Sequence, residues 1–289
     1  MRQNYFSAMS ETLATRAGHA TVSWLGFANV PLRRYLLDTF NQPYGDTGSF
    51  LANPCFEAVF GWRTATKTMS QLSSELLHPL VVSSMDSPDP ELKAEYRFPA
   101  DRYLYSHQLT SWQLLSGEVK NSVVVASGTG SGKTECFLVP ILDSLVREQL
   151  TIGGPLIGVR ALLLYPLNAL INSQRDRLLA WTYRLNNTVR FCLYNGMTPD
   201  ILPTAEAMVG SEIRDRKTLR KTPPPILVTN ATMLEYMLVR TQDLPILETS
   251  QGKLQWIILD EAHTYIGSQA AELALLIRRV LHAFGVKPK

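Results

Sequence analysis

A glycine-rich segment holds the residues whose types and spacing point most directly to chemistry. It reads Ser-Gly-Thr-Gly-Ser-Gly-Lys-Thr and follows the apolar run Val123 to Val125. Glycines let consecutive backbone N–H groups turn toward phosphates, a lysine can reach the β- and γ-phosphates, and the next hydroxyl can bind Mg²⁺. The alternative is a chance glycine turn. We predict an ATP-binding segment that consists of Ser127, Gly128, Thr129, Gly130, Ser131, Gly132, Lys133 and Thr134.

Two adjacent acids, Asp260 and Glu261, end a second apolar run, Trp256 to Leu259. Such a run is typical of a buried parallel strand, whose C-terminal end faces the ligand in open α/β sheets. Phosphoryl transfer requires positioning and charge neutralisation more than covalent chemistry. We therefore expect Asp260 and Thr134 to hold Mg²⁺, Glu261 to orient the attacking water, and Lys133 to neutralise charge. A plainer alternative is that the two acids only cap the following helix.

Together these segments resemble motifs I and II of the DEAH-box helicases of superfamily 2. Residues 260–263 read Asp-Glu-Ala-His, and residues 127–134 match the variant [Ala/Ser]-x-Thr-Gly-x-Gly-Lys-Thr, which such helicases commonly carry. The resemblance implies a P-loop NTPase of the α/β class, with a RecA-like parallel sheet flanked by helices and with ATP and Mg²⁺ as cofactors. It also places His263 among the catalytic residues, where the family uses it to couple the ATP site to later motifs.

Three further segments resemble motifs that come in the family's order. Residues 165–174 are similar to motif Ia, which contacts the backbone of the tracked strand. Residues 194–199 and 226–234 are similar to segments of the YprA-like branch, which has members that unwind DNA. The resemblance implies nucleic-acid contacts at Pro166, Asn168, Gln174, Thr229 and Asn230.

Upstream of the glycine segment, Tyr105-Ser106-His107-Gln108 resembles the short Q-like motif. In the family, a glutamine at this position hydrogen-bonds the adenine edge. We therefore predict that Gln108 contributes to base selection.

The elements that must position these residues follow from hydrophobic patterning. After Ser122, apolar runs alternate with helical stretches, which predicts a parallel α/β sheet. Strands are expected at 123–125, 160–164, 189–193, 226–228 and 256–259. Helices are expected at 133–148, 169–185, 211–221, 233–240 and 267–284.

The N-terminal third lacks this alternation and predicts short helices, for example at 32–40 and 71–77. We divide the chain into a mostly helical accessory region, 1–97, and an ATP-binding region, 98–289. The serine- and proline-containing segment 83–90 is the expected connector. Trp24 and Trp62 are expected in a core, and exposure of either would instead favour DNA guiding or partner docking.

Charge, cysteine spacing and hydropathy limit the classes of function that the chain could have. The net charge of +3 is too small to indicate nucleic-acid binding by itself, and the basic run from Arg214 to Lys221 is either a phosphate contact or a solvated helix face. Three cysteines lack metal or disulfide spacing, which favours a reducing, cytoplasmic location. Residues 20–30 are too interrupted to span a membrane. No cofactor motif or further acid cluster supports a nuclease or methylase.

The sequence ends at Lys289, 26 residues after His263, without the Ser-Ala-Thr motif III of the family. In the family, the motif III strand lies between the P-loop strand and the Asp-Glu strand, and a second RecA-like domain supplies an arginine finger. We expect the N-terminal piece of an ATP-dependent helicase or translocase that binds single-stranded DNA and meets a second RecA-like domain in cis or in trans. The alternative is a catalytically weak, nucleotide-dependent module that binds DNA or protein.

Overall fold

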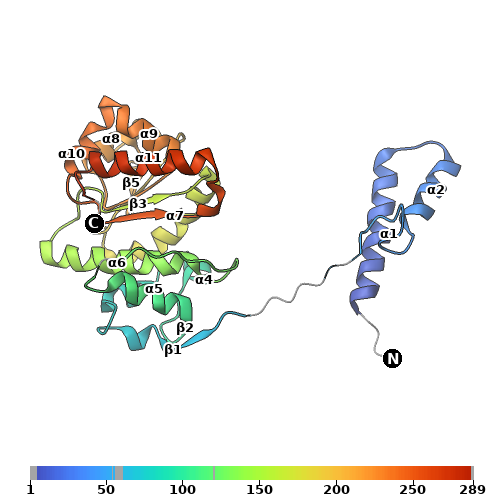
Figure 1. Cartoon of the computed structure of the whole chain (residues 1–289), viewed down its shortest axis with the longest axis horizontal. Coiled ribbons are helices and arrows are strands. Elements are labelled where there is room, and N and C mark those ends of the chain that lie inside the picture. The colour runs from blue at the N-terminus through green and yellow to red at the C-terminus, as the bar shows by residue number, and fades with distance from the viewer. Residues whose placement is uncertain (1–4, 54, 56–60, 120, 288–289) are drawn as a thin grey trace. The chain divides into compact units, whose positions relative to one another are not determined.

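A computed structural model describes residues 5–53, 55, 61–119 and 121–287. The chain divides into two compact units between Gly61 and Trp62 (Figure 1). The N-terminal unit contains helix α1, Tyr5–Leu25, and helix α2, Val30–Phe40, which pack against each other. The side chain of Asn29 accepts a hydrogen bond from the Leu32 N–H at 3.0 Å, and this N-cap starts α2. Trp24, near the end of α1, is 85% exposed, so the expectation that it lies in a core is wrong.

A six-stranded sheet forms the centre of the second unit, in the order β5-β6-β4-β7-β3-β8. All neighbouring strands are parallel except β5 and β6, which are antiparallel. In chain order the strands are β3, Ala161–Leu164; β4, Phe191–Tyr194; β5, Met208–Val209; β6, Glu212–Ile213; β7, Ile226–Thr229; and β8, Trp256–Leu259.

Helices cover both faces of this sheet, so the unit has the three-layer arrangement of α/β proteins. Alternate residues of β3 point to opposite faces: Ala161 and Leu163 belong to one buried cluster, Leu162 and Leu164 to the other. The first cluster includes residues of α6, Lys133–Ile152, and α7, Asn168–Thr182. The second includes residues of α8, Arg216–Lys221; α9, Ala231–Val239; α10, Leu244–Thr249; and α11, Ser268–Ala283. Figure 1 shows α8 to α11 on one side of the sheet and α6 on the other.

Smaller elements from the N-terminal part of this unit add residues to the first buried cluster. Strands β1, Thr64–Thr68, and β2, Tyr103–Tyr105, form an antiparallel pair. The remaining helices are α3, Pro79–Asp86; α4, Lys93–Tyr96; and α5, Ser106–Ser116. Single 3₁₀ turns lie at Ser70–Leu72, Tyr183–Leu185, Thr241–Asp243 and Ala262–Thr264.

The expected strand at 123–125 is not formed. Residues 121–128 have no regular secondary structure, and Val124 is 94% exposed. Strand β8 pairs with β3 on one side and, among the described residues, with no strand on the other. An extended segment needs a hydrogen-bonded neighbour to become a strand, and none of the described strands pairs with residues 123–125.

The second compact unit begins earlier in the chain than the ATP-binding region expected from residue 98. Met69, Leu77 and Met85 are buried in the same cluster as the sheet residues, so segment 62–97 packs with this unit. The expected connector at 83–90 is also wrong in its first half, because α3 continues to Asp86 and buries Met85.

Two expected helices differ in the structure. Residues 71–77 do not form an α-helix and contain the end of a 3₁₀ turn and an isolated bridge between Ser73 and Leu77. The helix expected at 211–221 begins at Arg216, because Glu212–Ile213 form β6 and pair with β4 and β5. Among the described helices, none combines the length and the apolar character that a membrane span requires.

Candidate functional site

The glycine segment forms a closed loop at the start of α6. Gly130 and Gly132 have φ angles of 74° and 75°, in the left-handed region that glycine adopts without strain. Lys133 is the first residue of α6, and its Nζ donates to the Ser127 carbonyl at 3.2 Å. The hydroxyls of Ser127 and Ser131 are hydrogen-bonded at 2.6 Å. The loop therefore presents the positive N-terminal end of a 20-residue helix, a ready site for an anion.

Two side chains of helix α5 contact backbone carbonyls of this loop. The Gln108 Nε2 donates to the Gly132 carbonyl at 3.3 Å, and the His107 Nε2 lies 2.9 Å from the Ser131 carbonyl. The Gln108 Oε1 also accepts from the Tyr105 N–H at 3.0 Å, and its side chain is almost fully buried. In this structure Gln108 supports the loop, and its contact with a base stays a prediction.

A cavity of about 410 Å³ lies in front of the loop, within the usual size range of small-ligand sites. Its wall includes residues 129–134 together with Gln108 and Glu261. Three parts of the sequence that were assigned to ATP binding therefore meet at one cavity. Ser127 and Gly128 are not on its wall and contribute to the loop instead.

Sequence reasoning missed an aromatic and cationic part of the cavity wall. The Arg102 guanidinium lies 5.4 Å from the ring centroid of Phe98 and 5.8 Å from that of Tyr105, and all three residues line the cavity. Trp62 lies beside the loop, with indole carbons 3.6–3.8 Å from the positions that a Cβ would take at Gly128 and Gly130. Of these residues only Tyr105 lies in a segment that a motif marked, and no signal in the sequence connected Trp62, Phe98 and Arg102 with the glycine loop.

Arg177, on α7, is a second cation on the wall of this cavity. Its guanidinium lies 5.9 Å from the ring centroid of Tyr96 and 5.8 Å from that of Trp181. Its Nε is buried without a hydrogen-bond partner among the described residues. The guanidinium is thus positioned by stacking and keeps hydrogen-bonding capacity for an anion. The spacing of Arg177 and Trp181, one turn apart, was the available signal.

Asp260 follows β8 and lies near Lys133. Burial raises the pKa of Asp260 above its usual range; hydrogen bonding from the Glu261 N–H and the charge of Lys133 oppose this rise. The Glu261 N–H donates to the Asp260 Oδ1 at 2.9 Å. The hydroxyl of Tyr165 also interacts with Asp260 and lowers the pKa of that carboxyl, although it makes no hydrogen bond of standard geometry. A cation beside Asp260 would favour its ionised form.

Glu261 has an unusual backbone conformation for a residue other than glycine. Its φ and ψ are 50° and 39°, in the left-handed region, where such residues are strained. The Thr264 N–H and hydroxyl both donate to its carbonyl, at 2.9 Å and 2.8 Å. The Nδ1 of His263 lies 3.3 Å from the Glu261 Oε2, and this histidine is 77% exposed. Helix α11 begins only at Ser268, so the two acids do not occupy its first turn.

Residues expected at the nucleic-acid side come together at the starts of α7 and α9. The Asn230 Nδ2 donates to the Asn168 Oδ1 at 2.9 Å, while the Asn230 Oδ1 caps α9 by accepting from the Met233 N–H at 2.8 Å. Asn230 and Pro166 line a second cavity, of about 750 Å³. Gln174 lies further along α7, within 3.4 Å of Arg177.

Thr229 does not belong to this set. It has no exposed surface, and its hydroxyl donates to the Tyr194 carbonyl at 2.6 Å. A side chain enclosed between strands β4 and β7 cannot reach a nucleic acid. The resemblance to a motif predicts a position along the chain but not the direction of a side chain. In β7 successive side chains point to opposite faces, and that of Thr229 is buried.

The basic run from Arg214 to Lys221 is largely used within the fold. Ion pairs join Arg214 to Glu212, Arg216 to Asp200 and Arg220 to Asp243, at 3.7, 3.6 and 2.8 Å. Asp243 is fully buried, so the Arg220 pair neutralises a charge inside the protein. This arrangement favours the structural interpretation of these arginines.

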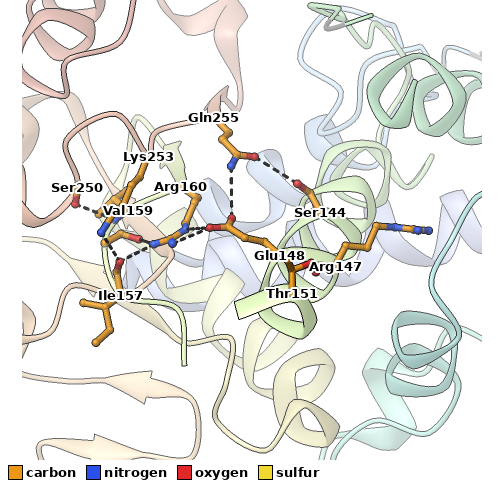
Figure 2. A network of polar contacts seen from close by, with 11 residues as sticks. Ser144, Arg147, Glu148, Thr151, Ile157, Val159, Arg160, Ser250, Lys253 and Gln255 are labelled. Atoms are coloured by element: carbon orange, nitrogen blue, oxygen red, sulfur yellow. Dashed lines mark hydrogen bonds and ion pairs between the residues drawn. The ribbon is translucent and has the colours of Figure 1, made fainter. Parts of the chain in front are cut away.

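A polar network connects the C-terminal half of α6 to the starts of β3 and β8 (Figure 2). The Arg160 guanidinium is buried and donates to the Glu148 Oε1 at 2.9 Å and 2.7 Å. Gln255, which precedes β8, accepts from the Ser144 hydroxyl at 3.4 Å and donates to Glu148 at 3.5 Å. Lys133 begins α6, and Asp260 directly follows β8. By connecting α6 to β8, this network fixes the two elements that carry Lys133 and Asp260 relative to each other.

The described residues contain no group of three or more His, Cys, Asp or Glu side chains suited to hold a metal ion. Cys136 and Cys192 are buried, Cys55 is exposed, and all three are free thiols. Mg²⁺ commonly uses only one or two protein ligands together with phosphates and waters. Thr134 and Asp260 therefore stay the predicted ligands.

Comparison with known proteins identifies the family. Residues 105–288 match the DEAD/DEAH box helicase family, and this segment is more than half of the chain. The chain belongs to this family.

Two curated relatives of this helicase-family chain are much longer than it is. Druantia protein DruE of Escherichia coli (strain UMEA 4076-1) is 29% identical over 269 residues, which cover 61% of the chain and 15% of DruE. The uncharacterized ATP-dependent helicase YprA of Bacillus subtilis (strain 168) is 27% identical over 209 residues, which cover 70% of the chain and 24% of YprA. The chain thus spans a quarter or less of each.

A solved structure supports the fold. The DUF1998 helicase MrfA, crystallised with DNA and AMPPNP, superposes with a TM-score of 0.54 and 24% identity, over 78% of the chain and 26% of MrfA. At this identity the likeness establishes the fold: a parallel α/β sheet flanked by helices. The fold expected from the sequence is confirmed.

Proposed function

We propose that the chain is the N-terminal ATP-binding part of a DNA helicase or translocase. The observation that carries this proposal is the cavity of about 410 Å³ whose wall combines the loop residues 129–134 with Gln108 and Glu261. Family membership supports ATP-dependent helicase activity, and YprA is named as an ATP-dependent helicase. MrfA, bound to DNA and AMPPNP, supports the choice of both ligands.

Each residue has a distinct role in this proposal. Lys133 and the N–H groups at the start of α6 bind the phosphates, and Gln108 reads the base. Thr134 and Asp260 hold Mg²⁺, which supplies charge neutralisation for phosphoryl transfer. Glu261, held in its strained conformation, orients the attacking water. His263 lies against Glu261 and is exposed, so it is available to transmit the state of the site to another domain.

The nucleic-acid side of the proposal uses the hydrogen-bonded pair of Asn168 and Asn230 together with Pro166 and Gln174. Amide side chains and helix N-termini bind phosphate and sugar groups without reading sequence. We therefore propose single-stranded DNA as the ligand, with contacts to its backbone. A second RecA-like domain, in cis or in trans, would supply the groups that complete catalysis.

Single-turnover ATP hydrolysis, with and without single-stranded DNA, tests this function. Glu261→Gln should abolish DNA-stimulated hydrolysis while leaving ATP affinity within a few-fold, because Glu261 acts on water and not on the phosphates. Glu91→Gln makes the same chemical change at an exposed acid and should have no effect. Measurable DNA-stimulated hydrolysis that is equal in the chain and its Glu261→Gln variant would contradict the proposal.

The second candidate is a nucleotide-dependent binding module with little catalysis. The observation in its favour is that residues 121–128, which lead into the loop, lie outside the sheet. Catalysis needs positioning within a fraction of an ångström, whereas binding tolerates a less rigid support. ATP binding without hydrolysis, in the presence of DNA, would favour this candidate.

A further inference from the structure

Arg177, near the middle of α7, carries a positive charge that the fold does not neutralise. Two residues earlier, the Arg175 guanidinium donates to the Glu212 carboxylate at 2.9 Å and 2.7 Å. Arg177 is half-buried, yet it forms no ion pair with any carboxylate among the described residues. Its one hydrogen bond in that part of the chain runs from Nη1 to the Gln174 Oε1 at 3.4 Å. Because arginines that lose solvent are normally paired, Arg177 is a candidate to bind an anionic ligand.

Two aromatic rings fix the position of this guanidinium. It lies 5.9 Å from the ring centroid of Tyr96 and 5.8 Å from that of Trp181. The Trp181 Nε1 donates to the Tyr96 carbonyl at 2.8 Å, which ties α7 to the end of α4. Contact with an aromatic ring uses the face of a guanidinium and leaves the N–H groups at its edge for other partners. One of these, the Arg177 Nε, is buried without a hydrogen-bond partner among the described residues, so a ligand that accepts from it would stabilise the site.

Arg177 faces the same cavity as the glycine loop. The cavity wall includes Arg177 together with Lys133 and Thr134. Lys133 and Thr134 begin α6, whereas Arg177 belongs to α7, so two helices each contribute a cation to one cavity. Burial raises the pKa of the Tyr165 hydroxyl; the charge of Asp260 adds to this rise, and the charge of Arg177 opposes it. Arg177 therefore acts on the same hydroxyl as Asp260, the predicted Mg²⁺ ligand.

A chain of phosphates is the anion that this arrangement fits. A guanidinium presents several N–H donors in one plane, which match pairs of phosphate oxygens, and it remains charged throughout the physiological pH range. The cavity of about 410 Å³ has room for a group larger than a single carboxylate. The N–H groups at the start of α6 favour a phosphate at the same cavity.

We propose that Arg177 is a phosphate-binding residue of the nucleotide site, which holds the phosphate chain of ATP from α7 while Lys133 holds it from the glycine loop. This inference rests on the proposed function, because it adds a second cation to the ATP cavity. Arg177 differs from an arginine that another domain would supply, since it already lies on the cavity wall within this unit. It should therefore contribute to ATP affinity in the isolated chain.

Isothermal titration of the full chain with Mg·ATP tests the role of Arg177. Arg177→Gln keeps a planar amide but removes the charge, and it should weaken ATP binding by about ten- to hundredfold through loss of charge-assisted hydrogen bonds. Arg177→Lys keeps the charge without the planar set of donors and should weaken binding only a few-fold. The control Arg184→Gln makes the same change at an exposed arginine just after α7, whose Nε donates to the Ser87 carbonyl. This control should bind ATP as the unsubstituted chain does.

Inorganic tripolyphosphate separates phosphate contacts from contacts with the base. It carries the same phosphate chain without a nucleoside, so Arg177→Gln should weaken its binding by the same factor as that of ATP. Thermal unfolding without ligand checks that each variant is folded. If Arg177→Gln does not fold, Arg177→Lys carries the test, with a few-fold loss of affinity for both ligands as the expected result.

The outcomes distinguish this inference from the function on which it rests. ATP binding that Lys133→Ala weakens but that folded variants of Arg177 leave unchanged would overturn the role of Arg177 alone. The same holds if substitution of Arg177 weakens binding of ATP but not of tripolyphosphate, because Arg177 would then act on the base or ribose. Absence of binding of both ligands to the unsubstituted chain would overturn the inference and the ATP site together.

Discussion

Two segments of the candidate nucleotide site each follow an apolar run, and these two runs are similar in composition but fold differently. Trp256–Leu259 forms β8 and pairs with β3 in parallel register. Val123 to Val125 has no partner strand in the part of the chain that the structure describes, and Val124 is exposed. The difference lies in the neighbour and not in the run itself, since backbone groups of an extended segment are stabilised only when they are paired.

The two halves of the site therefore depend on different supports. Asp260 follows a strand whose place is set by β3. The glycine loop is held instead by side chains of α5, through Gln108 and His107, and by the helix that it begins. The network around Glu148 connects these supports. Substitutions that remove one support at a time can show how far the halves are independent.

The largest loss of stability is expected when the connection between the supports is removed. Glu148→Ala leaves the Arg160 guanidinium buried without its carboxylate, which should lower the free energy of unfolding by about 3 kcal/mol. Urea denaturation of the full chain measures this. Glu75→Ala removes an exposed ion pair with Lys67 and should cost less than about 1 kcal/mol. Equal losses would show that the Glu148 network does not tie α6 to the sheet.

A substitution in the loop should affect binding more than stability. Gly132 has a positive φ, and a Cβ there would collide with the amide of Gln108. Gly132→Ala should therefore cost about 1–2 kcal/mol through backbone strain and weaken ATP binding by about tenfold or more by displacing Gln108. Gly153, with a φ of 77°, has nothing within 4 Å of its Cβ position. Gly153→Ala should show the strain alone, and a loss of ATP affinity there would contradict the role of Gln108.

The smallest expected effect is a pH dependence of stability that arises from the titration of Asp260. Burial raises the pKa of Asp260 in the folded protein, so the folded state binds this proton more tightly than the unfolded state. Its contribution to stability therefore falls as pH rises above about 4 and through the folded pKa. Asp260→Asn removes this loss, and its Tm without nucleotide should exceed that of the unsubstituted chain at neutral pH, with the gap closing toward pH 4.

Asp215 offers a comparison of opposite sign. Burial works against ionisation, but hydrogen bonds from Thr218 and from the Leu202 N–H hold the pKa of Asp215 below its usual range. Asp215→Asn should therefore lower the Tm at neutral pH, and the difference should vanish at low pH. If both variants shifted the Tm in the same direction, burial would not be the dominant influence on Asp260.

Hydrophobic patterning predicted the strands and helices whose packing partners were themselves predicted from the sequence. The apolar runs that became β3, β4, β7 and β8, and the helix that begins at Lys133, followed from periodicity and motif spacing. The strand at 123–125 failed because a strand requires a partner elsewhere in the chain. Thr229 was misassigned because a motif gives a position along the chain, whereas burial in β7 decides which side chain is exposed.

The remaining differences have the same non-local origin. Arg177 lies at the cavity in front of the glycine loop because Tyr96 and Trp181 stack around it, and Tyr96 comes from a segment without a motif. Met69 and Leu77 joined the main core, although the region before residue 98 lacks the strand-helix alternation. The exposure of Trp24 could not be deduced from an apolar residue type, which is compatible with a core and with an interface.

Isothermal titration of the chain with Mg·ATP is the measurement that tests the central claim most directly. The account predicts saturable binding at one site, weakened about ten- to hundredfold by Lys133→Ala through loss of charge-assisted hydrogen bonds. Lys217→Ala, which removes an exposed lysine far along the sequence from the loop, should bind as the unsubstituted chain does. Absence of binding, or equal affinity with and without the Lys133 ammonium, would contradict the assignment of the glycine loop and its cavity as the ATP site.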